Sequence, residues 1–261
     1  GLVITNGTLI EESDAKRIVE LGWDILTISI DGFEKTHEKI RGVKGCFRRT
    51  IRAVEFLNEW KRKLGSDKPL LRMNVVVAKD NLEELEGMIE LGRRLGFSEV
   101  LFQPITVFSK EGEEMKVKDE ELLERVLKKV GKRAREERMT TNVEKLLEEK
   151  SLDASKLKEL MLKSIEGKEG FLKILCFEPW YNLVISPEGW VGPCVVFGRS
   201  GINVREYSLK EIWFGIFERY RERLRRGEFL EFCENCCVPI FLETQRIRNE
   251  LEGLLCSRRS L

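Results

Sequence analysis

Seven cysteines are the side chains of this 261-residue sequence whose type and spacing could do chemistry. Five of the seven lie between Cys176 and Cys237. A Cys-x12-Gly-x4-Cys pattern runs from Cys176 to Cys194, and a CxxC pair, Cys233 and Cys236, follows with Cys237 directly after it. Thiolates are soft ligands that suit an iron–sulfur cluster or a zinc ion. The spacing therefore indicates a metal centre in this part of the chain.

The residues alone leave three interpretations of these cysteines open: an iron–sulfur cluster, a zinc site, or buried thiols without a metal. A disulfide framework is disfavoured, because the cysteine count is odd and the chain is large. A structural zinc site ordinarily uses two closely spaced pairs, whereas seventeen residues separate Cys176 from Cys194. We interpret Cys46 and Cys256 as structural thiols, with Cys46 buried at the start of a helix.

The overall composition excludes several classes of function. The 46 Lys and Arg residues nearly balance the 45 Asp and Glu residues, so a net charge of +1 provides no field to hold a phosphate backbone or an anionic membrane. The single histidine, His37, argues against His-based triads and His-rich metal sites, and we expect it to be exposed. No run approaches the roughly 18 apolar residues of a membrane span. We expect a cytoplasmic protein that binds neither nucleic acid nor membrane.

Short apolar runs alternate with amphipathic helices over residues 1–107, which is typical of a βα repeat. Asn81, with Glu84 three residues later, has the pattern of a helix N-cap in a capping box. Right-handed helical crossovers would join the strands into one parallel sheet. The predicted strands are residues 2–5, 25–30, 70–77 and 100–105.

The predicted strands have one polar face. Thr27, Ser29 and Asp31 alternate with apolar residues, and Asn74 and Gln103 interrupt the apolar runs of later strands. A parallel strand that is covered on both faces should be apolar throughout. We therefore expect a barrel-like sheet curved around a polar ligand cavity, with reactive groups near the carboxyl ends of the strands.

The composition divides the chain into three regions. Residues 1–108 are predicted to form a partial barrel of parallel strands, so the fold class is α/β. Residues 109–170 are dominated by charge and are interpreted as a linker of exposed helices that bridge two domains. Residues 171–261 carry the cysteines among many aromatic residues, and are predicted to form a small α+β domain with a β-hairpin that turns at 187–189.

Three further motifs accompany the cysteine pattern. They are Thr5-Asn-Gly-Thr8, Ile28-Ser-Ile-Asp-Gly32 and His37-Glu-Lys-Ile-Arg-Gly42. Together with the cysteines, these motifs resemble those of radical SAM enzymes that carry a SPASM or twitch auxiliary-cluster domain, and the resemblance covers nearly the whole chain. The cysteine set is most similar to the single-cluster twitch arrangement.

The resemblance implies a set of cofactors and site residues. Cys176, Cys194, Cys233 and Cys236 would hold an auxiliary [4Fe–4S] cluster, with Cys237 as an alternative to Cys236. Because four cysteines close the cluster, it would pass electrons and not ligate substrate. The S-adenosyl-L-methionine (AdoMet) contacts that the resemblance or the predicted cavity suggests are Ser29, Asp31, Arg41, Asn74 and Gln103.

Two family motifs are absent from the sequence. Radical SAM enzymes bind their catalytic cluster with a CxxxCxxC loop and hold the methionine end of AdoMet with a Gly-Gly-Glu-Pro motif, and neither occurs here. By the family's topology, residues 2–5 would be the third strand. We therefore expect the chain to be the C-terminal portion of a longer enzyme that binds AdoMet and a second [4Fe–4S] cluster, and expect that this portion alone does not cleave AdoMet.

The functional expectation follows from the resemblance. The complete enzyme would abstract hydrogen from a small-molecule or peptide substrate through a deoxyadenosyl radical, with a ferredoxin-type electron donor. Val195 follows Cys194 where several relatives have an acidic residue, which argues against a sulfatase-maturing type of mechanism. The alternative is a noncatalytic peptide-binding module or a zinc-stabilised protein.

Overall fold

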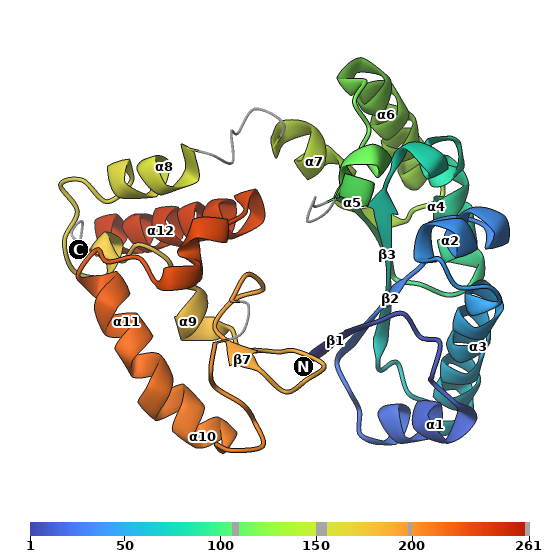
Figure 1. Cartoon of the computed structure of the whole chain (residues 1–261), viewed down its shortest axis with the longest axis horizontal. Coiled ribbons are helices and arrows are strands. Elements are labelled where there is room, and N and C mark those ends of the chain that lie inside the picture. Colours follow the sequence, from blue (N-terminus) through green and yellow to red (C-terminus); the bar gives the residue numbers. More distant parts are fainter. Residues whose placement is uncertain (106–109, 150–155, 198–199, 259–261) are drawn as a thin grey trace. The chain divides into compact units, whose positions relative to one another are not determined.

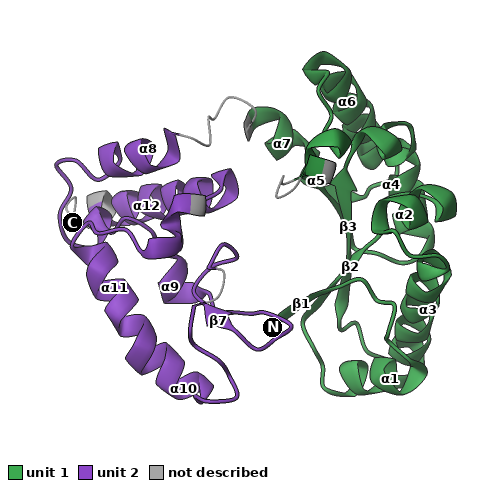
Figure 2. Ribbon diagram, viewed as in Figure 1, with its two compact units in different colours: residues 1–150 green, residues 151–261 purple. Residues whose placement is uncertain are grey.

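A computed structural model of the chain describes residues 1–105, 110–149, 156–197 and 200–258. The chain forms two compact units, Gly1–Lys150 and Ser151–Leu261, which have different colours in Figure 2. The boundary between the units falls inside the segment 109–170, for which the sequence suggests a linker. The limits of the three predicted domains stay a prediction.

Unit 1 is built on a five-stranded sheet in which every neighbouring pair is parallel and the strands lie in chain order (Figure 1). The α/β fold predicted from the sequence is confirmed. The strands are β1 (Leu2–Thr5), β2 (Ile25–Ser29), β3 (Leu70–Val77), β4 (Glu99–Pro104) and β5 (Thr140–Thr141). The helices are α1 (Glu12–Glu20), α2 (Glu34–Arg41), α3 (Cys46–Leu64), α4 (Leu85–Arg94), α5 (Lys110–Met115), α6 (Glu120–Glu136) and α7 (Val143–Glu149), with a 3-10 turn η1 (Lys79–Glu84).

The two faces of this sheet have different environments. On one face Ile28, Met73 and Val100 are neighbours in the register and are fully buried. Figure 1 shows α1, α3 and α4 along one side of the sheet. Residues of these helices pack against the buried residues of the strands. On the other face Leu2 and Ile4 are exposed. In the register of the sheet, Ile4 pairs with the polar Thr27 of β2, which in turn pairs with Arg72 of β3. The alternation in the sequence therefore separates a packed face from an open one.

Part of the charged segment belongs to the core of unit 1. Leu127, Val130 and Ala134 of α6 are buried, and α6 packs against α4. The next residues form β5, in which Thr140 pairs with Glu99 at the edge of the sheet. The expectation of exposed helices here is therefore wrong for α6, because a narrow apolar stripe is enough to bury one side of a highly charged helix.

The start of the fourth helix also differs from the prediction. Asn81 does not cap an α-helix, because it lies inside the 3-10 turn η1, and α4 begins only at Leu85. The Asn81 side chain is fully buried and accepts a hydrogen bond from the Ala78 backbone N–H at 2.9 Å. It therefore closes the turn that follows β3.

Unit 2 has little regular sheet. The predicted hairpin is confirmed, since β6 and β7 pair in antiparallel fashion around a turn in which Gly189 has φ of +89°. A Cβ at Gly189 would lie 2.8 Å from Asn203 Oδ1, so the turn requires glycine. The elements are α8 (Leu157–Lys163), η3 (Gly170–Lys173), α9 (Glu178–Tyr181), β6 (Val184–Ile185), β7 (Val191–Gly192), α10 (Leu209–Glu211), a π-helical η4 (Ile212–Ile216), α11 (Phe217–Arg225), η5 (Glu231–Asn235) and α12 (Val238–Arg258).

Two apolar clusters form the interior of unit 2. One surrounds Val191 and Phe217, and the other contains Leu175, Leu224 and Phe241 together with cysteines. Among the residues that the structure describes, no helix is long and apolar enough to cross a membrane.

Candidate functional site

The predicted cluster ligands come from three segments of unit 2. Cys176 lies just before α9, Cys194 follows β7, and Cys233 and Cys236 belong to η5 or end it. All four side chains are members of one apolar cluster, in which Cys176 and Cys194 are buried and the other two are partly buried. The structure therefore brings together the four cysteines singled out from their spacing.

Close packing at the hairpin positions Cys194. A Cβ on Gly192 would lie 2.0 Å from the Phe197 Cγ atom, so only glycine allows the chain to turn back over that ring. The Phe197 backbone N–H donates to the Cys194 carbonyl at 3.3 Å, which closes a tight turn around the cysteine. The hairpin and this turn fix the direction in which the thiol enters the apolar cluster.

Burial makes these thiols weak acids in the absence of a metal. It raises the pKa of Cys176, Cys194 and Cys236 to about 12, and it raises the pKa of Cys233 as well. The neighbouring thiols add to the rise for Cys194 and Cys236, since negative charges placed close together repel one another. A bound metal removes this cost, because a thiolate that ligates a metal is held in its deprotonated form.

The donor set fits an iron–sulfur cluster. In the described part of the chain, no three His, Cys, Asp or Glu side chains converge closely enough to hold a single metal ion. A cubane is wider than one ion, so its cysteine ligands stand farther apart than those of a mononuclear site. Thiolates are the ligands that such a cluster uses, and these four thiols pack in one apolar cluster.

The remaining cysteines have other surroundings. Cys237 also packs in the apolar cluster, and its role as an alternative to Cys236 stays a prediction. Cys46 is buried at the start of α3, as predicted. The cysteines whose side chains are described form no disulfide with one another. The Cys256 side chain lies outside the described set.

A second group of polar residues lies at the carboxyl end of β2 in unit 1. Asp31 is fully buried, and its Oδ1 accepts a hydrogen bond from the Val76 backbone N–H at 2.9 Å. Its Oδ2 lies 2.5 Å from Arg41 Nε. Asn81 Nδ2 donates to the Asp31 carbonyl at 2.6 Å and to the Val76 carbonyl at 2.7 Å. Two predicted contacts with AdoMet, Asp31 and Arg41, are therefore paired with each other.

His37 belongs to the same network and not to the surface. It is 1% exposed, and its Nδ1 accepts a hydrogen bond from the Asp31 backbone N–H at 3.0 Å. The expectation of an exposed histidine is wrong, because the polar sequence of α2 hides a ring that packs edge-on against Phe47. Burial lowers the pKa of His37, so the neutral ring is the favoured form.

The other predicted polar contacts lie on neighbouring strands. Ser29 is buried and pairs with Asn74 in the register of β2 and β3. Asn74 Nδ2 donates to Gln103 Oε1 of β4 at 3.3 Å. These three residues share the open face of the sheet, as the alternation predicts. The assignment of all five polar residues to AdoMet stays a prediction.

Sequence reasoning missed Asn81 and Glu84 as parts of this network. Glu84 Oε2 accepts from the Phe33 backbone N–H at 2.7 Å, and Glu84 Oε1 accepts from Thr36 Oγ1 at 2.5 Å. A Cβ on Gly32 would lie 2.6 Å from Glu84 Oε2, so the Glu84 carboxylate packs closely over this glycine. The capping-box spacing of Asn81 and Glu84 marks both residues in the sequence. That spacing does not indicate that they bind residues which follow the neighbouring strand β2, such as Asp31 and Phe33.

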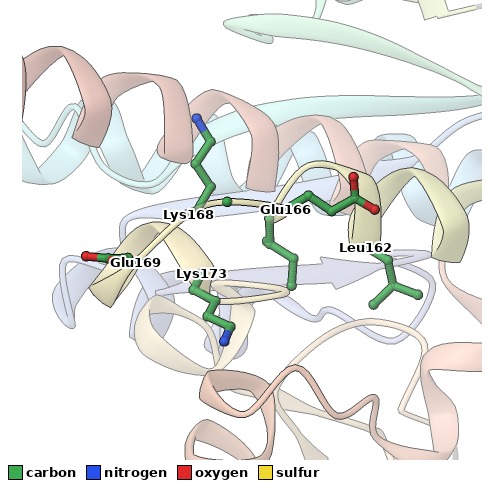
Figure 3. Close-up of a pocket in the computed structure, with 7 residues that line it drawn as sticks. Leu162, Glu166, Lys168, Glu169 and Lys173 are labelled. Carbon is green, nitrogen blue, oxygen red and sulfur yellow. The ribbon is translucent and has the colours of Figure 1, made fainter.

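A surface hollow in unit 2 is not part of the cysteine site. Its lining includes Leu162, Glu166, Lys168 and Lys173 but no cysteine, and its volume is about 560 Å³ (Figure 3). Lys168 is paired with Glu252 of α12. We assign no chemistry to this hollow.

Comparison with known families finds a match for part of each unit. The model of the SPASM domain, an iron-sulfur cluster-binding domain, matches residues 176–237, a range that begins at Cys176 and ends at Cys237. The model of the radical SAM superfamily matches residues 2–92, which include β1, β2 and β3. Two family models thus match different parts of the chain, the radical SAM superfamily in unit 1 and the iron-sulfur cluster-binding SPASM domain in unit 2. The expected cofactors were an auxiliary iron–sulfur cluster and, in the complete enzyme only, AdoMet with a second [4Fe–4S] cluster, and the two family matches confirm this expectation.

Individual radical SAM proteins are similar to this one over most of its length. The AdoMet-dependent heme synthase of Methanosarcina barkeri is 28% identical, over 93% of this chain and 70% of the relative. The Fe-coproporphyrin III synthase of the same organism is 27% identical, over 81% of this chain and 54% of the relative. This chain thus spans little more than half of the second relative.

A solved structure shares the fold. It is that of native anSMEcpe with bound AdoMet, which superimposes with a TM-score of 0.52 and 18% identity, over 90% of this chain and 62% of that chain. Such a likeness shows the fold alone. The 261 residues contain no CxxxCxxC sequence, and their only CxxC, at Cys233 and Cys236, lies in the range that matches the SPASM domain.

Proposed function

We propose that this radical SAM protein takes part in hydrogen abstraction by a deoxyadenosyl radical, and that unit 2 holds an auxiliary [4Fe–4S] cluster that passes electrons. The gathering of Cys176, Cys194, Cys233 and Cys236 in one apolar cluster carries this proposal. Four thiolates occupy all four irons of a cubane, so no iron remains open to a substrate. Such a cluster serves electron transfer, for example between the substrate radical and a ferredoxin-type protein.

The surroundings of the cysteines suit an electron-transfer role. Leu175 and Leu224 are fully buried in the same cluster, and Phe232 packs against it. Apolar cover limits the access of water, and solvent exposure is one of the factors that set the potential of an iron–sulfur centre. The side chains of unit 2 thus bind the cluster and insulate it.

Unit 1 supplies the polar groups for AdoMet in this proposal. Reduced by its own [4Fe–4S] cluster, AdoMet supplies the deoxyadenosyl radical. Asn74 and Gln103 lie on the open face of the sheet and can donate or accept hydrogen bonds there. Ser29 lies beside Asn74, while the ion pair of Asp31 and Arg41 fixes the end of β2. These residues bind and orient the ligand.

The relatives favour a tetrapyrrole as the substrate class. The names of both curated relatives, AdoMet-dependent heme synthase and Fe-coproporphyrin III synthase, refer to tetrapyrroles. A tetrapyrrole is a flat apolar ligand, and Leu2, Ile4 and Leu70 expose apolar surface on the open face of the sheet. Titration of the chain with iron coproporphyrin III tests this assignment. A saturable shift of the porphyrin absorbance band supports it, and its absence contradicts it.

Anaerobic reconstitution with iron and sulfide tests the cluster. We expect about four irons per chain and a brown protein. A Cys176→Ser variant should lose most of this iron, whereas Cys46→Ser, which removes a buried thiol of unit 1, should retain it. Stoichiometric zinc with a colourless protein would support the zinc-stabilised alternative and contradict the proposal.

Incubation with AdoMet and dithionite tests the catalytic part. The 261 residues contain no CxxxCxxC sequence to hold a catalytic cluster, so we propose that they release no deoxyadenosine by themselves. Release of deoxyadenosine by this chain alone would show that another arrangement of its cysteines binds AdoMet. Peptide binding without iron would support the noncatalytic binding module.

A further inference from the structure

Two buried side chains of α12 lie against the segment that carries Cys176. Thr244 is 1% exposed and Arg248 is 2% exposed. They are four residues apart on the helix, so they share one face. Both lie beyond residue 237, where the match to the SPASM domain ends. Neither residue has a role in the function proposed above.

Thr244 contacts the Cys176 sulfur directly. Its Oγ1 donates toward Cys176 Sγ at 3.7 Å, a long distance that suits the large radius of sulfur. A hydroxyl that donates to a ligand sulfur stabilises negative charge on that sulfur. The contact is therefore more favourable for a thiolate than for a thiol.

Arg248 holds the backbone that leads to Cys176. Its Nε donates to the Leu172 carbonyl at 3.0 Å, and its Nη2 donates to the Ile174 carbonyl at 2.6 Å. Nη1 donates to Ser164 Oγ at 3.0 Å and to Gln245 Oε1 at 2.9 Å. The guanidinium thus fixes η3 and the residue two before Cys176.

These partners leave the charge of Arg248 without a direct carboxylate partner. Every acceptor named above is neutral, and no ion pair to Arg248 occurs among the described residues of unit 2. Glu252, whose charge acts on Arg248 from the next turn of α12, is itself paired with Lys168. A buried charge without a direct counterion is costly. The nearby cysteines, once they ligate a cluster, provide negative charge in the same apolar interior.

We propose that Thr244 and Arg248 are positioning residues of the auxiliary cluster, and that they raise its reduction potential through Cys176. The proposal rests on the proposed role of Cys176 as a ligand. Reduction adds one electron to a centre that is already negative. A hydrogen bond to the ligand sulfur and a buried positive charge both favour the more negative state, so each raises the potential.

Potentiometric titration of the reconstituted full chain, followed by electron paramagnetic resonance, tests the role of Thr244. Thr244→Val removes the hydroxyl with little change of shape, and we expect a more negative midpoint potential at full iron content. Thr244→Ser retains the hydroxyl and should restore the potential of the parent protein. An unchanged potential in Thr244→Val at full iron content would overturn the proposal, as would equal loss of iron from both variants.

The charge of Arg248 is tested in the same titration. Arg248→Lys keeps the charge and Arg248→Gln removes it, so the potential should fall further in Arg248→Gln. Arg246→Gln is the matched control, because Arg246 is an exposed residue of the same helix, paired with Glu243 and Glu250. Equal potentials for Arg248→Gln and Arg246→Gln at full iron content would contradict the proposal.

The experiment separates this inference from the function on which it rests. Cys176→Ser with undiminished iron would overturn the ligand role of Cys176 and the inference with it. If the parent protein binds iron and Cys176→Ser does not, the cluster site stands. The potentials of the Thr244 and Arg248 variants then decide the role of α12 by themselves.

Discussion

The two units of this protein bury their interiors in different ways. Unit 1 packs aliphatic residues such as Ile28, Met73 and Val100 between a continuous parallel sheet and its helices. Unit 2 has strands of only two residues, and one of its two apolar clusters includes several thiols. A sheet with a continuous apolar face needs no metal, whereas buried thiols gain much of their stabilisation when a metal binds. We infer that unit 1 is stable without cofactor and that unit 2 depends on its cluster.

The largest effect should follow removal of iron. Anaerobic chelation should expose the backbone amides of unit 2 to exchange and leave those of unit 1 protected, because binding free energy of a structural metal is folding free energy. Hydrogen–deuterium exchange by peptide mass spectrometry measures both units in one sample. Equal protection of unit 2 before and after chelation would show that its apolar clusters are sufficient.

A core substitution in unit 1 should show the opposite pattern. Met73 is fully buried, and Met73→Ala should lower the free energy of unfolding by about 2–5 kcal/mol, because it leaves a cavity in the sheet's packed face. Iron content should stay unchanged. Leu9→Ala is the control, since Leu9 is 87% exposed and its truncation should change stability little. Loss of iron in Met73→Ala would mean that the units depend on one another.

A helix cap gives a smaller test within unit 2. Ser208 Oγ accepts from the Glu211 backbone N–H at 3.3 Å and forms a capping box at the start of α10. Ser208→Ala should cost about 1 kcal/mol in the cluster-bound protein, as measured by denaturant titration. Ser208→Asp supplies another oxygen at the cap and should recover most of the loss. A loss of unfolding free energy several times larger than this would contradict the prediction of a purely local cap.

Acidification should weaken unit 1 through His37, with the smallest effect. Burial lowers the folded-state pKa of His37 below its ordinary value of 6.5, although the Asp31 charge opposes this shift. The unfolded chain therefore binds the proton first, so the stabilising contribution is present above pH 6.5 and is lost as pH falls through and below that value. Denaturant midpoints of unit 1 between about pH 8 and 5 should decline in the parent protein. His37→Gln should abolish this decline, and an unchanged slope in the variant would contradict the assignment.

The sequence predicts repeated elements better than it predicts contacts across the sheet. The strands and the helix starting at Cys46 lie close to their predicted positions, because apolar periodicity and glycines mark them locally. The burial of α6 and β5 was missed, since charge dominates that segment and two residues are too few to show a pattern. Asn81 resembles a local cap, but the structure uses it to join Asp31 and Val76.

The candidate site also contains residues that the sequence indicates and residues that it does not. The cysteine spacing by itself selected the residues that the structure gathers in one apolar cluster, because metal ligands need particular atoms at particular intervals. The spacing contains no information on Thr244 or Arg248, which reach Cys176 and its backbone from a helix more than sixty residues away in the sequence.

By itself the sequence determined the α/β pattern, the family motifs and the set of candidate ligands. All three depend on residue type and short-range periodicity, which the order of amino acids carries directly. Only the tertiary structure decided that Asp31 pairs with Arg41, that His37 is buried, and that α12 contacts Cys176. These contacts join segments that are distant in sequence, and burial and charge compensation at such contacts arise only when the chain has folded.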